Sequence, residues 1–437
     1  MYELYPYFTN DGSVGLFSPD ADDIYHSTYG ALTEAYEKFI LPADLEKYFS
    51  NHNKIKILDI CFGIGYNTKS FLNYFYEKIF CKNDIAKNNY IETIDTNNNT
   101  YNATLDTDNK NSKNLDHEHL DSEKLSTEND NSNLKPEIYI KAIDTDKTLA
   151  FLSPFIVTGK RFWRREKIKF QQEKIEKMLK KNSAPKIWIN DEINIILLLK
   201  IIENHPEILE DTEITRLLAS SKYSRYFSGY MRRYFAFKKT KIGKYTPLKL
   251  LSAYLHNIYY RYISKRQKKA LNALKLLDFN FDLKIDDARK VLLTDNNIYN
   301  FVFLDAFTPA KCPCLWTVDF LRLLYSHLDV DGMILTYSNA ANIRSAFLEA
   351  GFYVGKIYNA QAGKFTGTIA VKNKSLIKNE LSEYDLGLLK TKAGIFYRDE
   401  NLTGLNEAIV AAHKKEVETS TRISSSKFIK QWKKNKM

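Results

Sequence analysis

The segment KIKILDICFGIGYNTKSFLNYF at Lys54 to Phe75 constrains the fold more than any other part of the chain. A short apolar run ends in an acidic residue, a glycine loop follows, and the segment closes with a helical pattern. This order predicts a strand, a turn and a helix. Gly63 and Gly65 allow the backbone of the turn to approach a ligand at the end of the strand, where open α/β sheets bind their ligands.

The glycine loop differs from a dinucleotide-binding loop at one position. A dinucleotide fingerprint requires a third glycine at residue 68, where this chain has Thr68. The loop therefore disfavours a nicotinamide cofactor. A purely structural turn remains the other interpretation of the two glycines.

Further short apolar runs alternate with helical patterns along the chain. They lie at residues 138–144, 281–288, 299–307 and 333–338, with a final pair at 352–360 and 367–372. Such alternation predicts an α/β fold with a mainly parallel, seven-stranded sheet and right-handed crossovers. YIETID, which ends at Asp95, nearly duplicates YIKAID, which ends at Asp144. We assign the second strand to the copy at Asp144, because it leads into a helix, whereas Asp95 leads into an asparagine tract.

Composition divides the chain into six segments. They are an N-terminal segment with the first half of the core (1–81), a low-complexity insertion (82–135), the second core strand (136–154), a basic helical insertion (155–269), the second half of the core (270–372) and a C-terminal helical tail (373–437). The first insertion is too polar to offset the entropy of ordering it, which predicts a disordered loop. The second is either a helical cap with an aromatic core or an RNA-contacting surface of basic and aromatic residues.

Charge, cysteine content and hydropathy limit the class of protein. The formal net charge of +11 favours a polyanionic partner. Four cysteines are too few for a disulfide framework in a chain of this length, which predicts a cytoplasmic location. The longest apolar run, INIILLLKII, is too short to span a bilayer, so no membrane association is expected.

Acidic residues follow three of the predicted strands. Asp144 can accept both ribose hydroxyls of an adenosine, and Asp287 is suited to accept from an adenine amino group. Asp305 ends the fourth strand, and the proline-rich loop after it is where an acceptor substrate should bind. Cys312 and Cys314 lack a second Cys/His pair, so a metal site is not expected.

The same acceptor loop carries a family resemblance. FLDAFTPAKCPCLW at Phe303 to Trp316 resembles the Asp-Gly-Phe-x-Pro-x-Lys-x-Pro-x-x-Trp motif of the MnmC methyltransferase domain, a family of tRNA wobble-uridine enzymes, with Ala306 in place of glycine. The resemblance continues in residues 22–40, in LDICFGIGYN, in DDAR at 286–289 and in residues 342–352. TKAGIFYRDENL at 391–402 is similar to the tail of stand-alone relatives, with Phe396 where proline is usual.

The resemblance implies a Rossmann-like class I methyltransferase that uses S-adenosyl-L-methionine, without FAD or metal, in a stand-alone form without an oxidase domain. The implied acceptor is the aminomethyl nitrogen of 5-aminomethyl-(2-thio)uridine at the wobble position, U34, in the anticodon stem-loop of tRNA, and the product is the methylaminomethyl form. A separate enzyme is expected to supply the aminomethyl precursor. Asp305 is the expected catalytic residue, which orients the amine and helps to remove its proton.

The expected binding residues form two groups. Those for the cofactor are Tyr25, Glu34, Asp59, Gly63, Gly65, Asn67, Asp144 and Asp287, and those for the substrate are Phe307, Pro309, Lys311 and Trp316. Two alternatives remain open. One is another Rossmann methyltransferase or an aminopropyltransferase, and the other is a catalytically inactive RNA-binding protein.

Overall fold

The computed structural model describes residues 2–19, 22–26, 28–76, 137–158, 189, 191–239, 265, 268, 272, 278–359 and 362–435. Residues 1–73 and 136–437 form one compact unit, and residues 74–135 form another. The strands and helices named below belong to the first unit. The loop predicted to be disordered, 82–135, and Asp95 within it lie outside the described residues.

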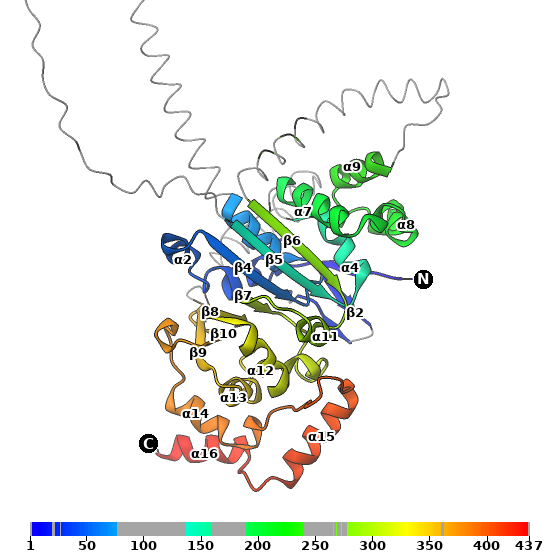
Figure 1. The fold of residues 1–437 in the computed structure, drawn as a ribbon. Coiled ribbons are helices and arrows are strands. Elements are labelled where there is room, and N and C mark those ends of the chain that lie inside the picture. The colour runs from blue at the N-terminus through cyan, green and yellow to red at the C-terminus, as the bar shows by residue number, and fades with distance from the viewer. Residues whose placement is uncertain are drawn as a thin grey trace, which may run out of the picture. The chain divides into compact units, whose positions relative to one another are not determined.

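A seven-stranded sheet is the centre of this unit (Figure 1). Its strands are β4 (Lys54–Ile60), β5 (Glu137–Asp144), β6 (Asp278–Ile285), β7 (Tyr299–Leu304), β8 (Leu328–Thr336), β9 (Tyr353–Asn359) and β10 (Lys364–Val371).

The strands lie in the order β6-β5-β4-β7-β8-β10-β9. Pairing is parallel from β6 to β8 and antiparallel on both sides of β10. Each predicted strand is present, and β5 ends at Asp144 beside β4. The predicted mainly parallel, Rossmann-like α/β sheet is therefore confirmed.

The helices described are α1 (Ala31–Ala35), the π-helix η1 (Tyr36–Ile40), α2 (Leu45–Asn51), α4 (Lys147–Leu152), α7 (Asp191–Asn204), α8 (Thr212–Ala219), α9 (Gly229–Lys239), α11 (Ala288–Leu293), α12 (Val318–His327), α13 (Ala341–Glu349), α14 (Glu383–Leu389), α15 (Asn406–Thr419) and α16 (Ser425–Asn435). A further helix begins at residue 66, directly after the glycine loop. Helices α7, α8 and α9 fall in the segment predicted as a helical insertion, and α14 to α16 fall in the predicted C-terminal tail.

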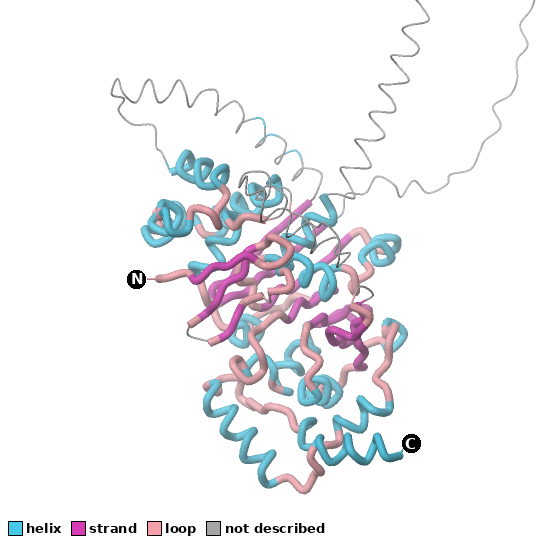
Figure 2. Tube along the Cα trace, turned by 180° about the vertical axis from the view of Figure 1, so that it is seen from behind, coloured by secondary structure: helices cyan, strands magenta, loops and turns pink. Residues whose placement is uncertain are grey.

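Both faces of the central strands are covered, as Figure 2 shows from behind. Leu58 and Leu304 belong to the large apolar cluster that includes residues of α11, α12 and α13. On the opposite face of the sheet, the Phe303 ring contacts Phe39 of η1, with ring centroids 5.6 Å apart. Successive residues of β4 and β7 thus face opposite sides of the sheet, and both sides are buried. Both strands therefore appear in the sequence as continuous apolar runs.

The N-terminal segment contains a second sheet that was not evident from the sequence pattern. It consists of β1 (Tyr5–Phe8), β2 (Val14–Ser18) and β3 (Asp23–Ile24), which pair in antiparallel fashion. The backbone N–H of Val14 donates to the Tyr66 hydroxyl at 2.9 Å. This bond ties the small sheet to the helix that follows the glycine loop.

No helix among the described residues is long and apolar enough to cross a membrane. The apolar run at Ile193 to Ile202 instead forms most of α7, whose side chains are largely buried. Figure 1 shows α7, α8 and α9 beside β6, while α14 to α16 lie at the other end of the unit, beyond α12 and α13.

A buried ion pair joins β5 to the loop after α11. The Lys141 Nζ lies 3.0 Å from the Asp295 carboxylate, and the two side chains are 7% and 4% exposed. Burial alone would raise the pKa of Asp295, but hydrogen bonds from Tyr299, Lys141 and Asn297 lower it to about 2. The pair therefore stabilises the fold at neutral pH.

We expect Lys141→Met to lower the free energy of unfolding by about 3–5 kcal/mol at pH 7, because it leaves a buried carboxylate without its cation. Ionised Asp295 stabilises the folded protein fully above the pKa of an unfolded aspartate. This stabilisation is lost as the pH falls through the folded-state pKa of about 2. The difference between native protein and variant should thus shrink between pH 4 and pH 2 in urea unfolding. Lys54→Met, which removes an exposed pair with Glu137, is the control and should cost under about 1 kcal/mol.

Candidate functional site

Most of the residues expected to bind a cofactor and an acceptor meet around one cavity at the carboxyl edge of the sheet. Its volume is about 500 Å³, within the usual range for small-molecule sites. Four strands end at it, because the carboxyl ends of β4, β5, β6 and β7 lie side by side. The expected residues that line it are Tyr25, Glu34, Gly63, Asn67, Asp144, Asp287, Asp305 and Phe307.

The two glycines after β4 have different roles. Gly63 lines the cavity with φ +53°, and a Cβ there would lie 3.6 Å from the Tyr25 ring, an ordinary contact. Gly65, with φ +74°, does not line the cavity, and its Cβ would lie 2.6 Å from both the Phe62 ring and the Ser153 hydroxyl. Gly63 is therefore placed to face a ligand, whereas Gly65 is required by the packing behind the loop.

Asp144 joins the ends of two neighbouring strands. One carboxylate oxygen accepts from the Gly63 N–H at 2.6 Å, and the other accepts from the Asp146 N–H at 2.8 Å. Burial raises the pKa of Asp144 to about 6, although backbone hydrogen bonds from Asp146 and Gly63 oppose the rise. Each oxygen keeps a further lone pair, so this carboxylate can accept the two hydroxyls of a ribose.

Asp305 lies one residue beyond β7 and faces the same cavity. Its Oδ2 accepts from the Asn67 side-chain amide at 3.0 Å. Burial raises the pKa of Asp305 to about 6, against the opposing effects of this hydrogen bond and of nearby Lys38. Asp305 is thus mainly ionised at neutral pH but can still take up a proton.

Asn67 lies between two buried carboxyl groups. Asp59 does not line the cavity, and its Oδ2 accepts from the Thr68 hydroxyl at 2.6 Å. Burial raises the pKa of Asp59 to about 7. The Oδ1 atoms of Asp59 and Asn67 are buried and have no hydrogen-bond partner among the described residues. The Asn67 amide therefore orients Asp305 from the start of the helix that follows the glycine loop.

A wall opposite the strand ends comes from the N-terminal segment. Tyr25 packs against Phe307 with ring centroids 4.7 Å apart. The Lys38 Nζ donates to Glu34 at 3.1 Å and lies 5.6 Å from the centroid of the Tyr337 ring. Lys38 and Tyr337 also line the cavity but were not predicted. No sequence motif distinguishes a lysine on a helix or a tyrosine after a strand that lines a cavity from one that does not.

The acceptor loop is held by residues expected to bind substrate. Trp316 is fully buried, and its indole N–H donates to the Phe307 carbonyl at 2.9 Å. The Lys311 Nζ lies on the surface, 3.3 Å from Asp22. Neither side chain lines the cavity, and Pro309 does not line it either. Phe307 thus faces the site, while Trp316 holds the loop that positions it.

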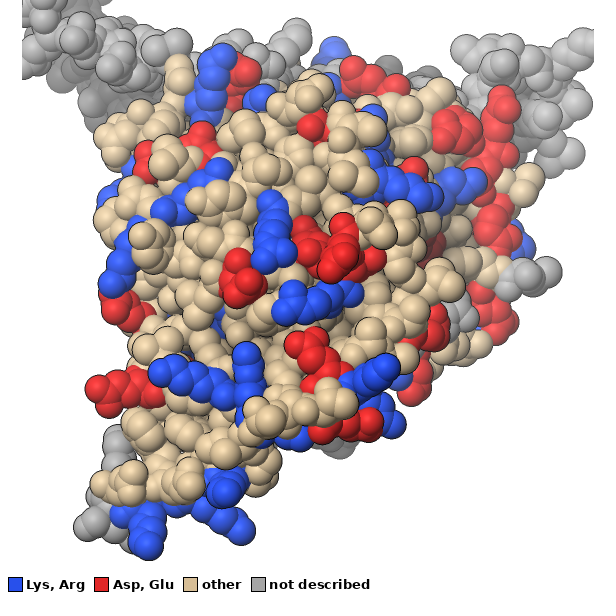
Figure 3. Space-filling view, turned by 60° about the horizontal axis from the view of Figure 1, so that its bottom comes forward, with Lys and Arg blue, Asp and Glu red and all other residues tan. Residues whose placement is uncertain are grey.

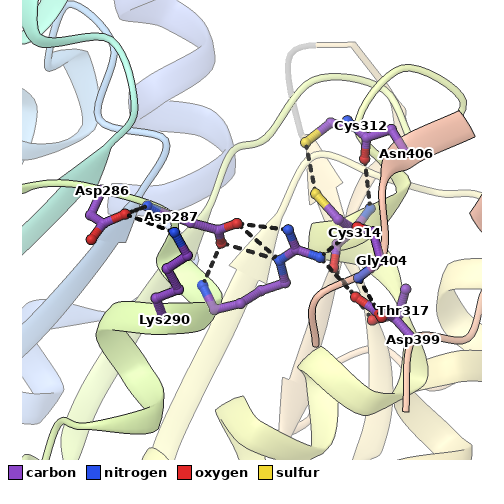
Figure 4. Close-up of polar contacts among 10 residues, drawn as sticks. Asp286, Asp287, Lys290, Cys312, Cys314, Thr317, Asp399, Gly404 and Asn406 are labelled. Atoms are coloured by element: carbon purple, nitrogen blue, oxygen red, sulfur yellow. Dashed lines mark hydrogen bonds and ion pairs between the residues drawn. The ribbon is translucent and has the colours of Figure 1, made fainter. Parts of the chain in front are cut away.

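The cavity ends at an arginine network beyond β6 (Figure 4). Asp287 caps α11, and its two oxygens accept from the backbone N–H and the guanidinium of Arg289. These hydrogen bonds hold the pKa of Asp287 below its usual value, although burial opposes them. These four contacts come from three N–H groups, because the Arg289 Nε–H is shared between the two oxygens. Asp287 lines the cavity and is mainly engaged with Arg289.

A buried lysine lies behind the glycine loop. Lys69 is completely buried, and its Nζ donates to the Ser153 carbonyl at 3.0 Å. Burial lowers the pKa of this amine to about 7. The Ser153 hydroxyl in turn donates to the Ile64 carbonyl at 2.9 Å. Lys69 and Ser153 thus link the loop to the short η3 helix (Ser153–Phe155).

The residues present fit a cofactor that contains an adenosine and a charged amino acid part. Asp144 offers a carboxylate for ribose, Gly63 leaves room at the wall, and the orphaned Oδ1 of Asn67 can accept from an ammonium group. Among the described residues no group of three or more His, Cys, Asp or Glu side chains could hold a metal ion.

Comparison with known proteins agrees with this fit. Residues 250–373 match a family described as S-adenosyl-L-methionine-dependent methyltransferase. An uncharacterized protein, MJ0670 of Methanocaldococcus jannaschii, is 34% identical over 133 residues, which are 30% of this chain and 37% of that protein. The tRNA 5-methylaminomethyl-2-thiouridine biosynthesis bifunctional protein MnmC of Burkholderia vietnamiensis is 37% identical over 83 residues, or 19% of this chain and 13% of that protein. The chain thus matches less than half of either relative.

The crystal structure of MNMC2 from Aquifex aeolicus has a similar fold. It superimposes with a TM-score of 0.51 at 18% identity, over 96% of this chain and 86% of that one. The family match and the MnmC relative show that this chain contains a region related to S-adenosyl-L-methionine-dependent methyltransferases of the MnmC type, within a Rossmann-like sheet.

Proposed function

We propose that this protein methylates the aminomethyl nitrogen of 5-aminomethyl-(2-thio)uridine at the wobble position U34 of tRNA, and so forms the methylaminomethyl nucleoside. The observation that carries the proposal is the position of Asp305, which faces the same cavity as Asp144 and accepts a hydrogen bond from Asn67, at the start of the helix after the glycine loop. We further propose that the tRNA anticodon stem-loop is the partner, that a separate enzyme supplies the aminomethyl precursor, and that the reaction takes place in the cytoplasm.

The chemistry requires removal of a proton from the acceptor. An alkylammonium has a pKa of about 10.4, so at neutral pH its nitrogen lacks the lone pair needed for attack. S-adenosyl-L-methionine, when bound, supplies an electrophilic methyl group on a sulfonium. Asp305, ionised at neutral pH, can hold the ammonium group and accept its proton as the nitrogen becomes nucleophilic.

The aromatic part of the cavity lining suits a nucleobase. Tyr25 and Phe307 lie in contact on its wall, and both rings are partly exposed. Proteins that bind unpaired RNA bases stack them on aromatic side chains of this kind. The name of the Burkholderia relative also refers to this class of modified uridine. Together these features favour a wobble uridine over a small-molecule amine.

We expect Asp305→Asn to slow methyl transfer to wobble-modified tRNA by about a hundredfold, because the amide has the same shape but cannot accept a proton. For the native enzyme, kcat/KM should rise with pH as Asp305 ionises near pH 6 and then level off. The variant depends on free amine, so its rate should continue to rise toward the pKa of the amine. Nucleoside mass spectrometry over a pH series measures both profiles.

Asp295→Asn controls for the change of a buried aspartate to an amide outside the cavity lining, and it is assayed at a temperature at which circular dichroism shows it to be folded. It should retain the native pH profile. A native rate in Asp305→Asn would refute the catalytic role of Asp305. Failure of the native enzyme to methylate aminomethyl-uridine tRNA, while it binds S-adenosylhomocysteine, would instead favour another methyltransferase substrate.

The C-terminal helix α16 carries a concentration of positive charge suited to a nucleic-acid backbone. Residues 420–437 contain no acidic residue. Phe428 and Trp432 pack against Tyr384 at 5.8 and 5.6 Å between ring centroids, while four lysines of α16 are exposed, namely Lys427, Lys430, Lys433 and Lys434. Figure 3 brings forward the end of the unit where α14 to α16 lie, and basic and acidic side chains are interspersed over most of that face. We infer that α16 contacts phosphates of the tRNA.

Changing these four lysines to Gln should weaken tRNA binding at least tenfold at low salt and should reduce its salt dependence, since fewer counterions are released. Filter binding across a salt series measures both effects. Affinity for S-adenosylhomocysteine should be unchanged. A variant with Gln at four other exposed lysines, Lys47, Lys54, Lys374 and Lys378, loses the same charge and is the control. An equal loss of affinity in both variants would show that only net charge matters.

A further inference from the structure

The segment before α15 forms part of the cavity wall, although the sequence pattern TKAGIFYRDENL at 391–402 suggested no role for it. Gly404, Leu405 and Asn406 line the cavity together with residues of β6 and β7. The Asn406 side-chain oxygen accepts from the Cys314 N–H of the acceptor loop at 3.3 Å. The C-terminal part of the chain therefore contributes directly to the site.

An ion pair fixes this segment to the core (Figure 4). Arg289 donates to the Asp399 carboxylate at 2.8 Å and to the Gly404 carbonyl at 2.9 Å. The other Asp399 oxygen accepts from the Gly404 N–H at 2.9 Å, and the Asp399 N–H donates to Asp319 at 2.7 Å. Arg289 and Asp399 are each only 9% exposed. Loss of Arg289 would leave the buried Asp399 carboxylate without its cation, so the contact holds the segment firmly.

The order of the strands indicates which part of a cofactor reaches this wall. Asp305 follows β7, Asp144 ends β5, and Asp287 follows β6 at the edge of the sheet. A nucleoside with its ribose at Asp144 and its reacting group at Asp305 directs its base toward β6. Because Asp287 is already engaged with Arg289, neighbouring residues of the cavity wall are better placed to contact the base at that end.

Leu405 is suited to provide such a contact. Its side chain is 73% exposed, the highest value among the exposed large apolar residues that the structure describes. On the wall of a cavity, an apolar side chain in this position gains free energy when a flat base covers it. An exposed leucine elsewhere on the surface would not be covered by the base of a bound cofactor.

We propose that the segment from Gly404 to Asn406 is the base-binding wall of the cofactor site, with Leu405 as its apolar contact and the Arg289–Asp399 ion pair as the element that positions it. This inference rests on the use of S-adenosyl-L-methionine by the chain. It assigns a function to the C-terminal segment and makes Asp399 a positioning residue, since Asp399 acts on the cofactor only through the wall.

Titration calorimetry of the full chain with S-adenosylhomocysteine tests the proposal. Leu405→Ser should weaken binding at least fivefold without changing the thermal unfolding temperature, because an exposed side chain contributes little to the fold. Leu293→Ser is the matched control, since Leu293 is 57% exposed at the end of α11 and does not line the cavity. It should bind S-adenosylhomocysteine like the native protein.

Asp399→Asn should weaken binding at least tenfold, because the wall loses its ion pair. Asp385→Asn removes the partner of Arg344 and Lys356 outside the cavity lining, so it controls for loss of an ion pair as such. The proposal would be wrong if Leu405→Ser and Asp399→Asn both bound S-adenosylhomocysteine with native affinity. Loss of affinity in Asp144→Ala would then show that the cofactor site itself is correctly placed. If the native protein did not bind S-adenosylhomocysteine, both the cofactor site and its proposed base-binding wall would be wrong. If Asp399→Asn does not fold, Leu405→Ser still decides the question.

Discussion

Strand β4 pairs in parallel with β5 on one side and with β7 on the other, and the site depends on this double pairing. Asp59 lies beside Ala142 of β5 and Phe303 of β7, so the three strands end together. The pairing extends beyond the strands, where the Asp305 N–H donates to the Ile60 carbonyl at 3.4 Å and the Phe62 N–H donates to the Ile143 carbonyl at 3.1 Å. Residues that lie far apart in the chain are therefore brought to one cavity.

The same arrangement brings several acidic side chains together in a buried environment. Asp59, Asp144 and Asp305 all have pKa values raised by burial. Such clustering costs stability, because buried carboxylates repel one another and lose hydration. Local hydrogen bonds from Thr68, Gly63 and Asn67 offset part of that cost. Shifted pKa values of this kind are common where proteins bind charged ligands or move protons.

Sequence patterns predicted the strand ends but not the contacts across the fold. Asp144 and Asp305 could be placed because each ends an apolar run, and parallel strands bring such ends to one edge. Lys38 and Leu405 could not be placed, since each reaches the cavity through tertiary contacts made by distant segments. The sheet of β1 to β3 was missed because its strands are short and two of them are only partly buried. Trp316 was expected to bind substrate; its side chain does not line the cavity, and its indole N–H donates to the Phe307 carbonyl.

Lys69 has a chemical consequence that follows from its burial. Most lysines are protonated at neutral pH and react slowly with acylating reagents, but an amine with a pKa of about 7 is half unprotonated there and is intrinsically nucleophilic. Its complete burial keeps such reagents away from it in the folded protein. Acylation of Lys69 therefore requires local opening, which also rehydrates the amine and restores the ordinary lysine pKa. This single amine is a natural reporter of local opening at the centre of the fold.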